Sequence, residues 1–240
     1  MSSDNSKTFN KSNLDRYLNE LSKAYKKLGG KNMPAEIILI GGAAIIENYG
    51  FRDMTTDIDA VICAASVMNE AIVKVGDKFE LPTGWLNNDF MKTTSYSRKL
   101  ADYSVFYKTF NQVLDVRTIN SEYLIAMKLR SGRQYKNDIS DIIGILAEHE
   151  KRGDSITYEK IDKAVVNLYG SWNEISADSV KFIKDALTDG DYEQIYIQIR
   201  KSEQDAKETL VEFQEQYHDA LKEENVDSVL KSLKSKKRKE

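Results

Sequence analysis

Cysteine, histidine and proline are scarce in this chain. Its 240 residues include one cysteine, two histidines and two prolines. The lone Cys63 excludes an intrachain disulfide and suits a reducing compartment. Because it ends an apolar run, we expect it to be buried like a small apolar residue. With so few nitrogen and sulfur ligands a zinc site is not expected, so a metal ion would have to be a hard cation held by carboxylates.

Long apolar runs are also absent. No stretch approaches the ~20 apolar residues that a membrane helix needs, and the polar start MSSDNSKTFNKS lacks the apolar core of a secretory signal. We therefore expect a cytoplasmic protein without a membrane partner. The formal net charge of −3 predicts no general affinity for polyanions, although the last ten residues, KSLKSKKRKE, carry six basic side chains and one acidic one.

The hydrophobic pattern changes near residue 150. Before it, helical periods alternate with short β-branched runs, whereas helical periods alone remain beyond Gly153. We therefore predict an α/β (α+β) fold in which a small mixed β-sheet is flanked by helices and followed by a C-terminal helical region. The expected boundaries are a flexible N-terminus at 1–11, the α/β core at 12–152, the helical region at 153–230 and a basic tail at 231–240.

Individual elements follow from the periodicity and from turn and cap residues. Strands are expected at 36–40, 56–63, 103–110 and 112–119. Helices are expected at 14–28, 43–48, 66–79, 120–130 and 137–148, with shorter ones capped by Thr157 and by Ser176 or Asp178. The last long helix should begin at Asp191 and continue for about thirty residues, and a short helix should precede the basic tail.

The most informative stretch is Ile37–Ala60, IILIGGAAIIENYGFRDMTTDIDA. Gly41 and Gly42 stand between an expected strand and helix, where a missing Cβ lets a ligand approach the backbone and a helix N-terminus favours a phosphate. A glycine pair is equally typical of a simple tight turn. Asp57 and Asp59, however, point the same way in an extended strand, and two buried carboxylates are unfavourable unless a cation lies between them. Together these features predict phosphoryl or nucleotidyl transfer.

The run GGAAIIENYGFRDMTTDIDAV resembles the signature of the DNA-polymerase-β-like nucleotidyltransferase superfamily: a glycine turn, a helix and an acid pair on the next strand. The pattern R-x-x-T-x-D-I-D at 52–59 is similar to that of the bacterial branch with AbiEii-type and Men-type toxin nucleotidyltransferases. The segments LPTGWLNNDF and EYLIAMKLRSGRQYKNDISDI resemble two further motifs of those proteins. The resemblance covers about 12–200 and implies a nucleotidyltransferase core at 12–152. Trp85 is expected to anchor the core and Asn87 to lie at the pocket rim.

The resemblance implies a catalytic site for two Mg²⁺ ions. Asp57 and Asp59 would bind the metal, which bridges the phosphate oxygens and neutralises charge on the leaving pyrophosphate. A third carboxylate would come from a neighbouring strand. Asp115, in VLDVR, is the candidate because it is the only acid within the apolar part of the later strands. The alternative for Asp115 is a surface position at a strand end.

Nucleotide-binding residues are also implied by the resemblance. Gly41, Gly42, Arg52 and Thr55 would contact the nucleotide, although Arg52 could instead brace the loop before the acid pair. The superfamily often has serine after the glycine, where its hydroxyl contacts a phosphate. Here Ala43 follows, which leaves phosphate binding to backbone N–H groups and nearby cations.

A second group of implied nucleotide-binding residues comprises Lys128, Asp138 and Asp141. By the resemblance Lys128 reaches the nucleotide phosphates, whereas a lysine in an apolar helical run can also extend to solvent. Arg133, Asp138 and Asp141 form an R…D-x-x-D unit. Its two acids are three residues apart on one helix face, so both can approach Lys128 or the metal region, and acids at a helix N-terminus also stabilise the helix itself.

The leading hypothesis is an Mg²⁺-dependent enzyme that moves NMP from an NTP such as ATP onto an acceptor hydroxyl and releases pyrophosphate. By the resemblance the acceptor could be a tRNA 3′ end and the protein a toxin with a cognate antitoxin; a protein side chain or an antibiotic is an equal alternative. A second hypothesis is a catalytically inactive nucleotide-binding antitoxin or regulator that acts through protein contacts. A third is an α/β scaffold without a ligand.

Overall fold

The computed structural model describes residues 7–222 and 225–237, and this part of the chain forms two compact units. The first unit runs to Met127 and includes Ile161–Ser171. The second comprises Lys128–Lys160 and the chain from Trp172 onward. The boundary expected at residue 152 describes a change in sequence character and stays a prediction.

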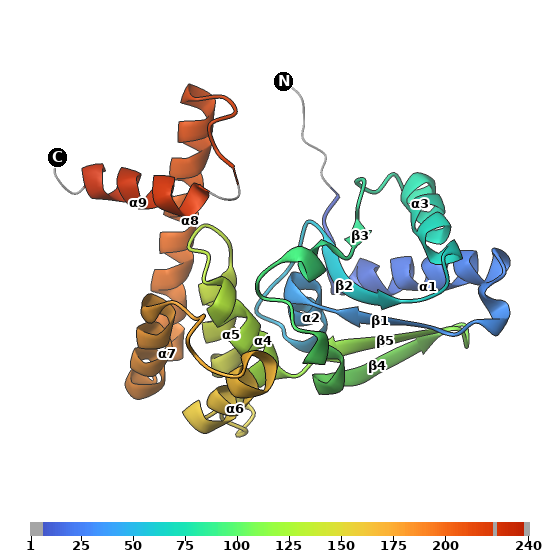
Figure 1. Cartoon of the computed structure of the whole chain (residues 1–240), viewed down its shortest axis with the longest axis horizontal. Helices are drawn as coiled ribbons and strands as arrows, with labels where there is room; N and C mark the ends of the chain where they lie inside the picture. Colours follow the sequence, from blue (N-terminus) through green and yellow to red (C-terminus); the bar gives the residue numbers. More distant parts are fainter. Residues whose placement is uncertain (1–6, 223–224, 238–240) are drawn as a thin grey trace. The chain divides into compact units, whose positions relative to one another are not determined.

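A mixed five-stranded sheet forms the centre of the first unit (Figure 1). The strand order is β3-β2-β1-β5-β4. β1 is antiparallel to β2 and parallel to β5, β2 is parallel to β3, and β4 is antiparallel to β5. The strands are β1 (Ala35–Leu39), β2 (Ile58–Cys63), β3 (Leu86–Asn87), β4 (Ser104–Phe110) and β5 (Leu114–Ile119). The predicted α/β fold class with a small mixed sheet is confirmed.

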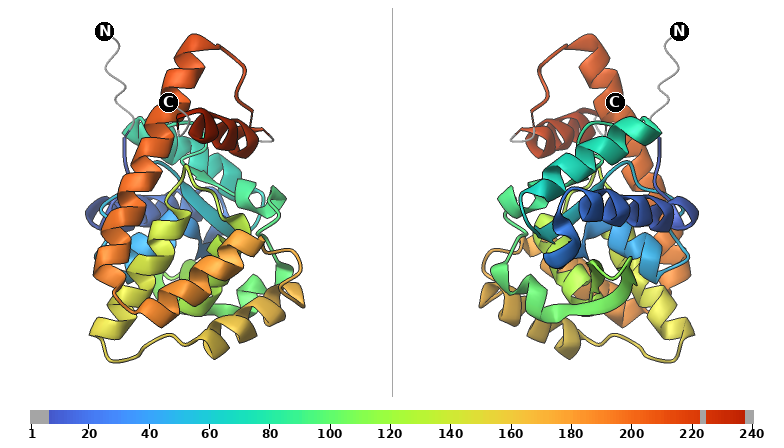
Figure 2. Two further views of the ribbon diagram at one scale, coloured as in Figure 1. Left: turned by 90° about the vertical axis from the view of Figure 1, so that its left-hand side faces the viewer. Right: turned by 90° about the vertical axis from the view of Figure 1, so that its right-hand side faces the viewer.

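Helices flank this sheet. α1 and α3 pack against each other on one side of it (Figure 2), because each presents a row of apolar side chains at helical spacing. The helices of the first unit are α1 (Lys11–Lys27), α2 (Gly41–Asn48), α3 (Val67–Phe79), most of α4 (Ser121–Ser131) and most of α6 (Tyr158–Tyr169). Short 3₁₀ turns lie at Gly30–Asn32, Asp89–Lys92 and Arg98–Tyr103.

The second unit is helical, as the sequence predicts beyond residue 153. It contains α5 (Asp138–Lys151), α7 (Ala177–Asp189), α8 (Tyr192–Gln216) and α9 (Val226–Lys237). α8 has 25 residues and is shorter than expected because Tyr217 caps it. α9 packs back against α8 through Ala206, Leu210 and Leu230 (Figure 2). Much of the expected basic tail is therefore helical, while 238–240 lie outside the described residues.

The flexibility expected for residues 1–11 stays a prediction, but two of the described residues among them make defined contacts. Phe9 is fully buried and pairs with Thr55 in an isolated β-bridge. Asn10 caps α1 by accepting from the backbone N–H groups of Ser12 and Asn13. An aromatic anchor and a cap therefore hold residues 9–13 in place. Residues 1–6 lie outside the described part of the chain.

Cys63 is exposed, so the prediction that it is buried is wrong. It is the last residue of β2 and lies opposite Glu36, whose side chain is also partly exposed. The apolar run before it reaches the end of the strand, but the sheet is less covered there. None of the helices in the described ranges is both long and apolar enough to cross a bilayer.

Glu47 on α2 is a buried carboxyl group within the first unit. Its residue is 5% exposed. The nearby Tyr107 hydroxyl donates to Asp15 Oδ1 at 2.9 Å, and the Lys11 ammonium donates to the backbone oxygen of Glu47 at 3.0 Å. Burial raises the pKa of the Glu47 carboxyl, and its polar neighbours offset only part of that rise.

We expect the stability of Glu47→Gln relative to wild type to be higher at alkaline pH than at acidic pH. A raised native pKa stabilises the fold below the unfolded-state pKa, and this contribution is lost as pH rises through the native pKa. The unfolding free energy of the variant, measured relative to wild type, should therefore rise between pH 5 and pH 8. Urea denaturation at both pH values measures it, with the exposed Glu70→Gln as control. Parallel stability curves for wild type and Glu47→Gln would contradict the assignment.

Candidate functional site

The turn between β1 and α2 brings several predicted residues together in the first unit. Gly41 has φ +55°, a left-handed conformation that favours glycine, and α2 begins there without a side-chain cap. A Cβ added to Gly42 would lie 2.6 Å from Thr55 Oγ1 and 2.8 Å from Arg52 Nη2. The missing side chain at Gly42 therefore leaves room for Arg52 and Thr55 at the start of the helix.

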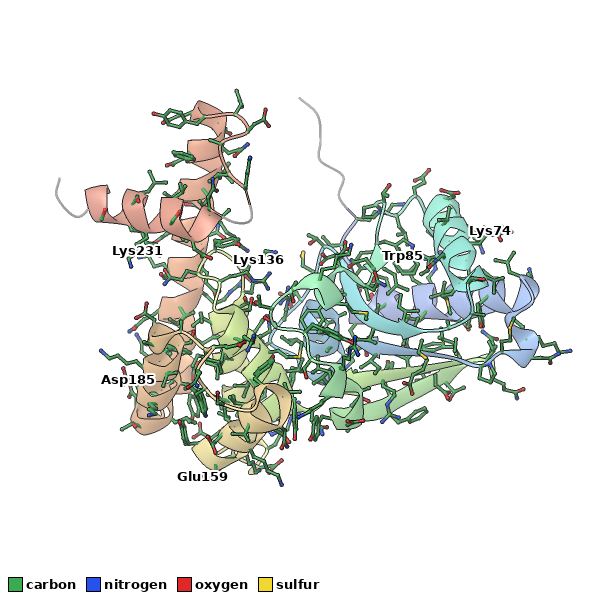
Figure 3. The ribbon with its side chains drawn as sticks, viewed as in Figure 1. Lys74, Trp85, Lys136, Glu159, Asp185 and Lys231 are labelled. Atoms are coloured by element: carbon green, nitrogen blue, oxygen red, sulfur yellow. The ribbon has the colours of Figure 1, made fainter. Side chains whose placement is uncertain are left out.

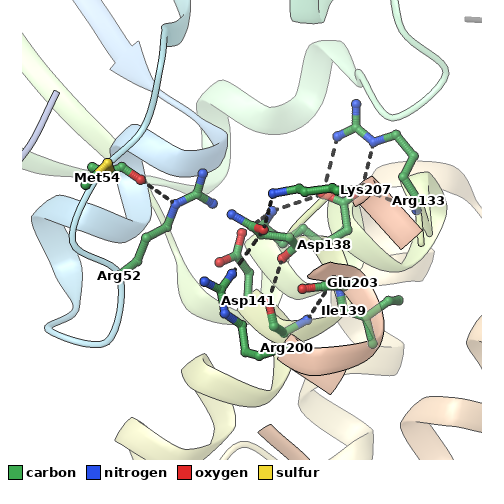
Figure 4. Close-up of polar contacts among 12 residues, drawn as sticks. Arg52, Met54, Arg133, Asp138, Ile139, Asp141, Arg200, Glu203 and Lys207 are labelled. Atoms are coloured by element: carbon green, nitrogen blue, oxygen red, sulfur yellow. Dashed lines mark hydrogen bonds and ion pairs between the residues drawn. The ribbon is translucent and has the colours of Figure 1, made fainter. Parts of the chain in front are cut away.

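The loop that supplies Arg52 and Thr55 is held by the chain near the N-terminus. Thr55 exchanges two backbone hydrogen bonds with Phe9, at 2.7 and 2.8 Å. Arg52 Nε donates to the carbonyl of Met54 at 3.1 Å (Figure 4). The guanidinium is thus fixed at one edge while its Nη2 end lies close to Gly42. This placement fits both predicted roles of Arg52, bracing the loop and facing a phosphate.

Asp59 lies beside the glycine turn. It is half-buried on β2, and its backbone oxygen accepts a hydrogen bond from the N–H of Ile40 at 2.9 Å. A Cβ on Gly41 would lie 3.6 Å from Asp59 Oδ2, so the carboxylate borders the turn. Asp57 is exposed in the bend that precedes β2, because this strand begins at Ile58 rather than at Thr56 as expected.

Asn87 lies on β3 and is the neighbour of Asp59 on the side of β2 that faces away from β1. The two residues pair in the parallel register of β2 and β3, which places their side chains on the same face of the sheet. Asn87 Nδ2 donates to the carbonyl of Gly84 at 3.2 Å, and its Oδ1 accepts from the N–H of Asp89 at 2.9 Å. The sequence indicated only a rim position for Asn87, since a two-residue strand has no periodic signal.

Trp85 anchors this short strand, as predicted. Trp85 (Figure 3) is 2% exposed. Its Nε1 donates to the carbonyl of Ile72 at 3.0 Å. The ring stacks on Phe9 and meets Tyr17 edge-on. Because the backbone oxygen of Trp85 accepts from the N–H of Ile58, the buried ring also sets where the next residues lie beside β2.

Asp115 does not join the acid pair, which corrects the predicted three-carboxylate site. It pairs with Glu36 at the start of β1, whereas Asp59 meets Ile40 just beyond the other end of that strand. Four residues of strand separate the two levels by about 13 Å. Asp115 is exposed and accepts a hydrogen bond from the Thr109 hydroxyl at 2.5 Å. The alternative considered for it, a surface aspartate at a strand end, describes it.

No group of three or more acidic, histidine or cysteine side chains with metal-binding geometry occurs among the residues that the structure describes. The reason in the first unit is the strand register. The end of β5 nearest the glycine turn carries Thr118 and Ile119, and its only acid is at the opposite end. The pairing of Asp57 with Asp59 at this site stays a prediction.

The second unit contains a separate buried cluster around Lys128. Its Nζ lies 3.1 Å from Asp138 Oδ1 and 2.7 Å from Asp141 Oδ2, and all three residues are buried. Lys128 thus does not extend to solvent. Arg133 adds a bond from Nε to Asp138 Oδ2 at 2.8 Å (Figure 4). The i,i+3 spacing brings both carboxylates to Lys128, which is one of the two placements that the sequence allowed.

Asp138 stays ionised in this cluster. Burial alone would raise the pKa of its carboxyl, but the charges of Lys128 and Arg133 bring the pKa well below its ordinary value. α5 also begins at Asp138, and a helix N-terminus favours negative charge. The cluster therefore holds a buried lysine ammonium between two buried carboxylates.

A family comparison supports the sequence resemblance at its coarser level. A model of the family described as nucleotidyltransferase of unknown function (DUF6036) matches residues 16–174, well over half of the chain. The chain belongs to this family. The match includes the glycine turn, the acid pair and the Lys128 cluster, and it ends before α7. No curated protein and no solved structure matches the chain.

We expect Gly42→Ala to disturb the site of this family member. The added methyl group would overlap the Thr55 hydroxyl and the Arg52 guanidinium, so one or both must move, at about 1–3 kcal/mol of stability. Binding of a non-hydrolysable triphosphate, measured by calorimetry, should weaken by about tenfold or more. Gly50→Ala is the matched control, since nothing lies within 4 Å of its added Cβ. Equal affinity in both variants would disprove a role for this close approach.

We expect Lys128→Met to destabilise the protein strongly. The substitution leaves Asp138 and Asp141 buried without the ammonium group between them, a loss of about 3–5 kcal/mol. The defect should shrink at acidic pH, because without the Lys128 charge the pKa of Asp138 rises and the carboxyl becomes protonated more readily. Thermal unfolding at pH 4 and pH 7 tests this, with Lys181→Met on an exposed position of α7 as control. A Lys128→Met protein as stable as the control would show that the ion pairs contribute little.

Proposed function

We propose that this protein is a nucleotidyltransferase that moves NMP from an NTP onto an acceptor hydroxyl and releases pyrophosphate. The observation that carries the proposal is the arrangement at one turn. Asp59 Oδ2 borders Gly41, and the Arg52 guanidinium borders Gly42. A carboxylate for a metal ion and a cation for phosphate thus flank the N–H groups that open α2.

The acid pair fits Mg²⁺. Asp57 and Asp59 supply only oxygen ligands, and Mg²⁺ is commonly bound by one or two carboxylates together with substrate phosphates and water. A third carboxylate is therefore not a requirement for one ion, whereas the two-metal site expected with Asp115 has no support in the strand register. Held by Asp57 and Asp59, Mg²⁺ would supply the positive charge that neutralises the charge developing on the leaving pyrophosphate.

The chain's own residues would orient the reaction. Arg52 and the N–H groups at Gly41 and Gly42 would hold the triphosphate, and Thr55 would keep Arg52 in position beside Gly42. The acceptor oxygen then attacks the α-phosphorus, and the bond from that phosphorus to the bridging oxygen of the β-phosphate breaks. The acceptor proton passes to solvent and pyrophosphate departs with the bond's electrons.

The finer parts of this proposal come from the sequence resemblance. Lys128, Asp138 and Asp141 are proposed as nucleotide-binding residues, with ATP among the candidate substrates. A tRNA 3′ end is the proposed acceptor, and a toxin with a cognate antitoxin the proposed biological setting. The basic residues of α9, such as Lys231 (Figure 3), would favour a polyanionic acceptor.

A second candidate function is nucleotide binding without turnover, in a regulatory protein that acts through protein contacts. Two observations favour it. Asp115 lies on β5, beside the end of β1 that is distant from the glycine turn, so it supplies no third carboxylate. Ala43 stands where a serine hydroxyl often contacts a phosphate. The glycine turn and Asp59 could then bind a nucleotide without supporting transfer.

One experiment separates the two candidates. The protein is incubated with each labelled NTP, Mg²⁺ and total RNA, and label transfer is measured. We expect transfer that falls by about 100-fold or more in Asp59→Asn, because the metal loses a ligand. Asp115→Asn is the matched control, an equal change of charge on the same sheet, and should retain wild-type transfer. Nucleotide binding without transfer would favour the regulatory candidate, and loss of transfer in Asp115→Asn would contradict the site as assigned.

A further inference from the structure

Glu203, in the middle of α8, is a buried acid that no motif predicted. Its residue is 3% exposed, and its Oε1 accepts hydrogen bonds from the backbone N–H groups of Ile139 at 3.2 Å and Ser140 at 3.1 Å. These N–H groups belong to the first turn of α5, where no intrahelical acceptor exists. A carboxylate 63 residues away in sequence from Ser140 therefore caps this helix (Figure 4).

The usual cap of α5 is engaged elsewhere. Asn137 stands at the N-cap position, but its side chain makes no capping hydrogen bond, and its backbone is not extended as in an ordinary cap. Instead, Asn137 Oδ1 accepts from Arg200 Nη1 at 3.1 Å and from Lys207 Nζ at 3.2 Å. α8 thus engages the side chain of Asn137, the residue at the N-cap position. The Glu203 carboxylate of α8 caps α5 instead.

The acids of the first turn are also engaged. Asp138 and Asp141 both face Lys128, so their carboxylates neutralise the ammonium group instead of capping the helix. Their positions depend on the backbone of the turn that carries them. The two N–H groups held by Glu203 belong to residues 139 and 140, which lie between these two aspartates in sequence.

The buried position of the Glu203 carboxyl is by itself unfavourable for stability. Its Oε2 is buried without a hydrogen-bond partner among the described residues, and burial raises the pKa of the carboxyl. The negative charge of Asp141 adds to that rise. A helix N-terminus is one of the few environments in which such a group is favourable, because the first N–H groups carry partial positive charge.

We propose that Glu203 is a positioning residue for the cluster of Lys128, Asp138 and Asp141. The Glu203 Oε1 holds the first turn of α5. It thereby keeps Asp138 and Asp141 at the separation at which both carboxylates contact Lys128. α8 lies beyond residue 174, where the family match ends. The segment outside the family match therefore orients residues inside it. The part of this inference that concerns nucleotide use rests on the proposed function; the part that concerns the cluster does not.

The test uses the full-length protein in four variants. Glu203→Ala removes the cap, Glu203→Asp keeps the charge but withdraws the oxygen by one methylene, and Glu203→Gln keeps an oxygen at the same reach. Glu208→Ala is the matched control, an exposed glutamate on the same helix. Two readouts report on the cluster directly: amide hydrogen exchange at Ile139 and Ser140, and the carboxyl titration of Asp138 followed by carbon NMR.

We expect exchange at both amides to accelerate by about tenfold or more in Glu203→Ala and Glu203→Asp, because each loses its hydrogen bonds to a carboxylate. The pKa of Asp138 should rise toward its ordinary value in the same two variants, as its contact with Lys128 loosens. Glu203→Gln should restore slow exchange and the low pKa, and Glu208→Ala should match wild type. If Glu203→Ala does not fold, the Asp and Gln variants decide between the outcomes.

Activity supplies the last comparison. If the protein transfers nucleotide, KM for the triphosphate should rise about tenfold in Glu203→Asp with a smaller change in kcat, and recover in Glu203→Gln. Without any transfer by wild type, the proposed function fails while exchange and titration still decide the role of Glu203. Unchanged exchange and an unchanged Asp138 pKa in folded Glu203→Ala or Glu203→Asp would overturn the inference, as would fast exchange in folded Glu203→Gln.

Discussion

The close approach of side chains to a bare backbone at Gly41 and Gly42 is the constraint on which the first unit's site depends. Asp59 borders the first glycine, and Arg52 and Thr55 border the second. Any Cβ at Gly42 would occupy the volume of their polar atoms. The N–H groups that open α2 are thereby flanked by one carboxylate and one guanidinium, a combination suited to a metal-bound phosphate chain.

The supports of this turn lie far from it in sequence. Phe9 pairs with Thr55 and stacks on Trp85, and Trp85 holds β3 beside β2 so that Asn87 neighbours Asp59. One aromatic cluster therefore sets both the loop that carries Arg52 and the strand beside the acid pair. The second unit contains a site of another kind, because the charged residues of the Lys128 cluster are buried and depend on one another. Lys128 lies between Asp138 and Asp141, and Arg133 also contacts Asp138, so removing one charge leaves the others buried with fewer partners.

The local elements were predictable from the sequence because their signals are local. Apolar spacing located α1, α3 and α5, and the turn residue Asn111 separated β4 from β5, where it adopts positive φ. The spacing of Asp138 and Asp141 placed both carboxylates on one face toward Lys128. The burial of Cys63 was misjudged and that of Phe9 was not foreseen, since burial depends on which neighbours cover a strand end or a terminal segment, and these come from other parts of the chain.

The glycine pair with the acid pair, the R…D-x-x-D unit and the mixed α/β fold could be recognised from the sequence alone. Each depends on residues close together in sequence or on their periodicity. Tertiary structure decided which acids meet. Strand register, a non-local property, separates Asp115 from Asp59 despite their similar surroundings in sequence. The same is true of Glu203, whose role as a cap arises only because packing of α8 on α5 brings together backbone and carboxylate from distant segments.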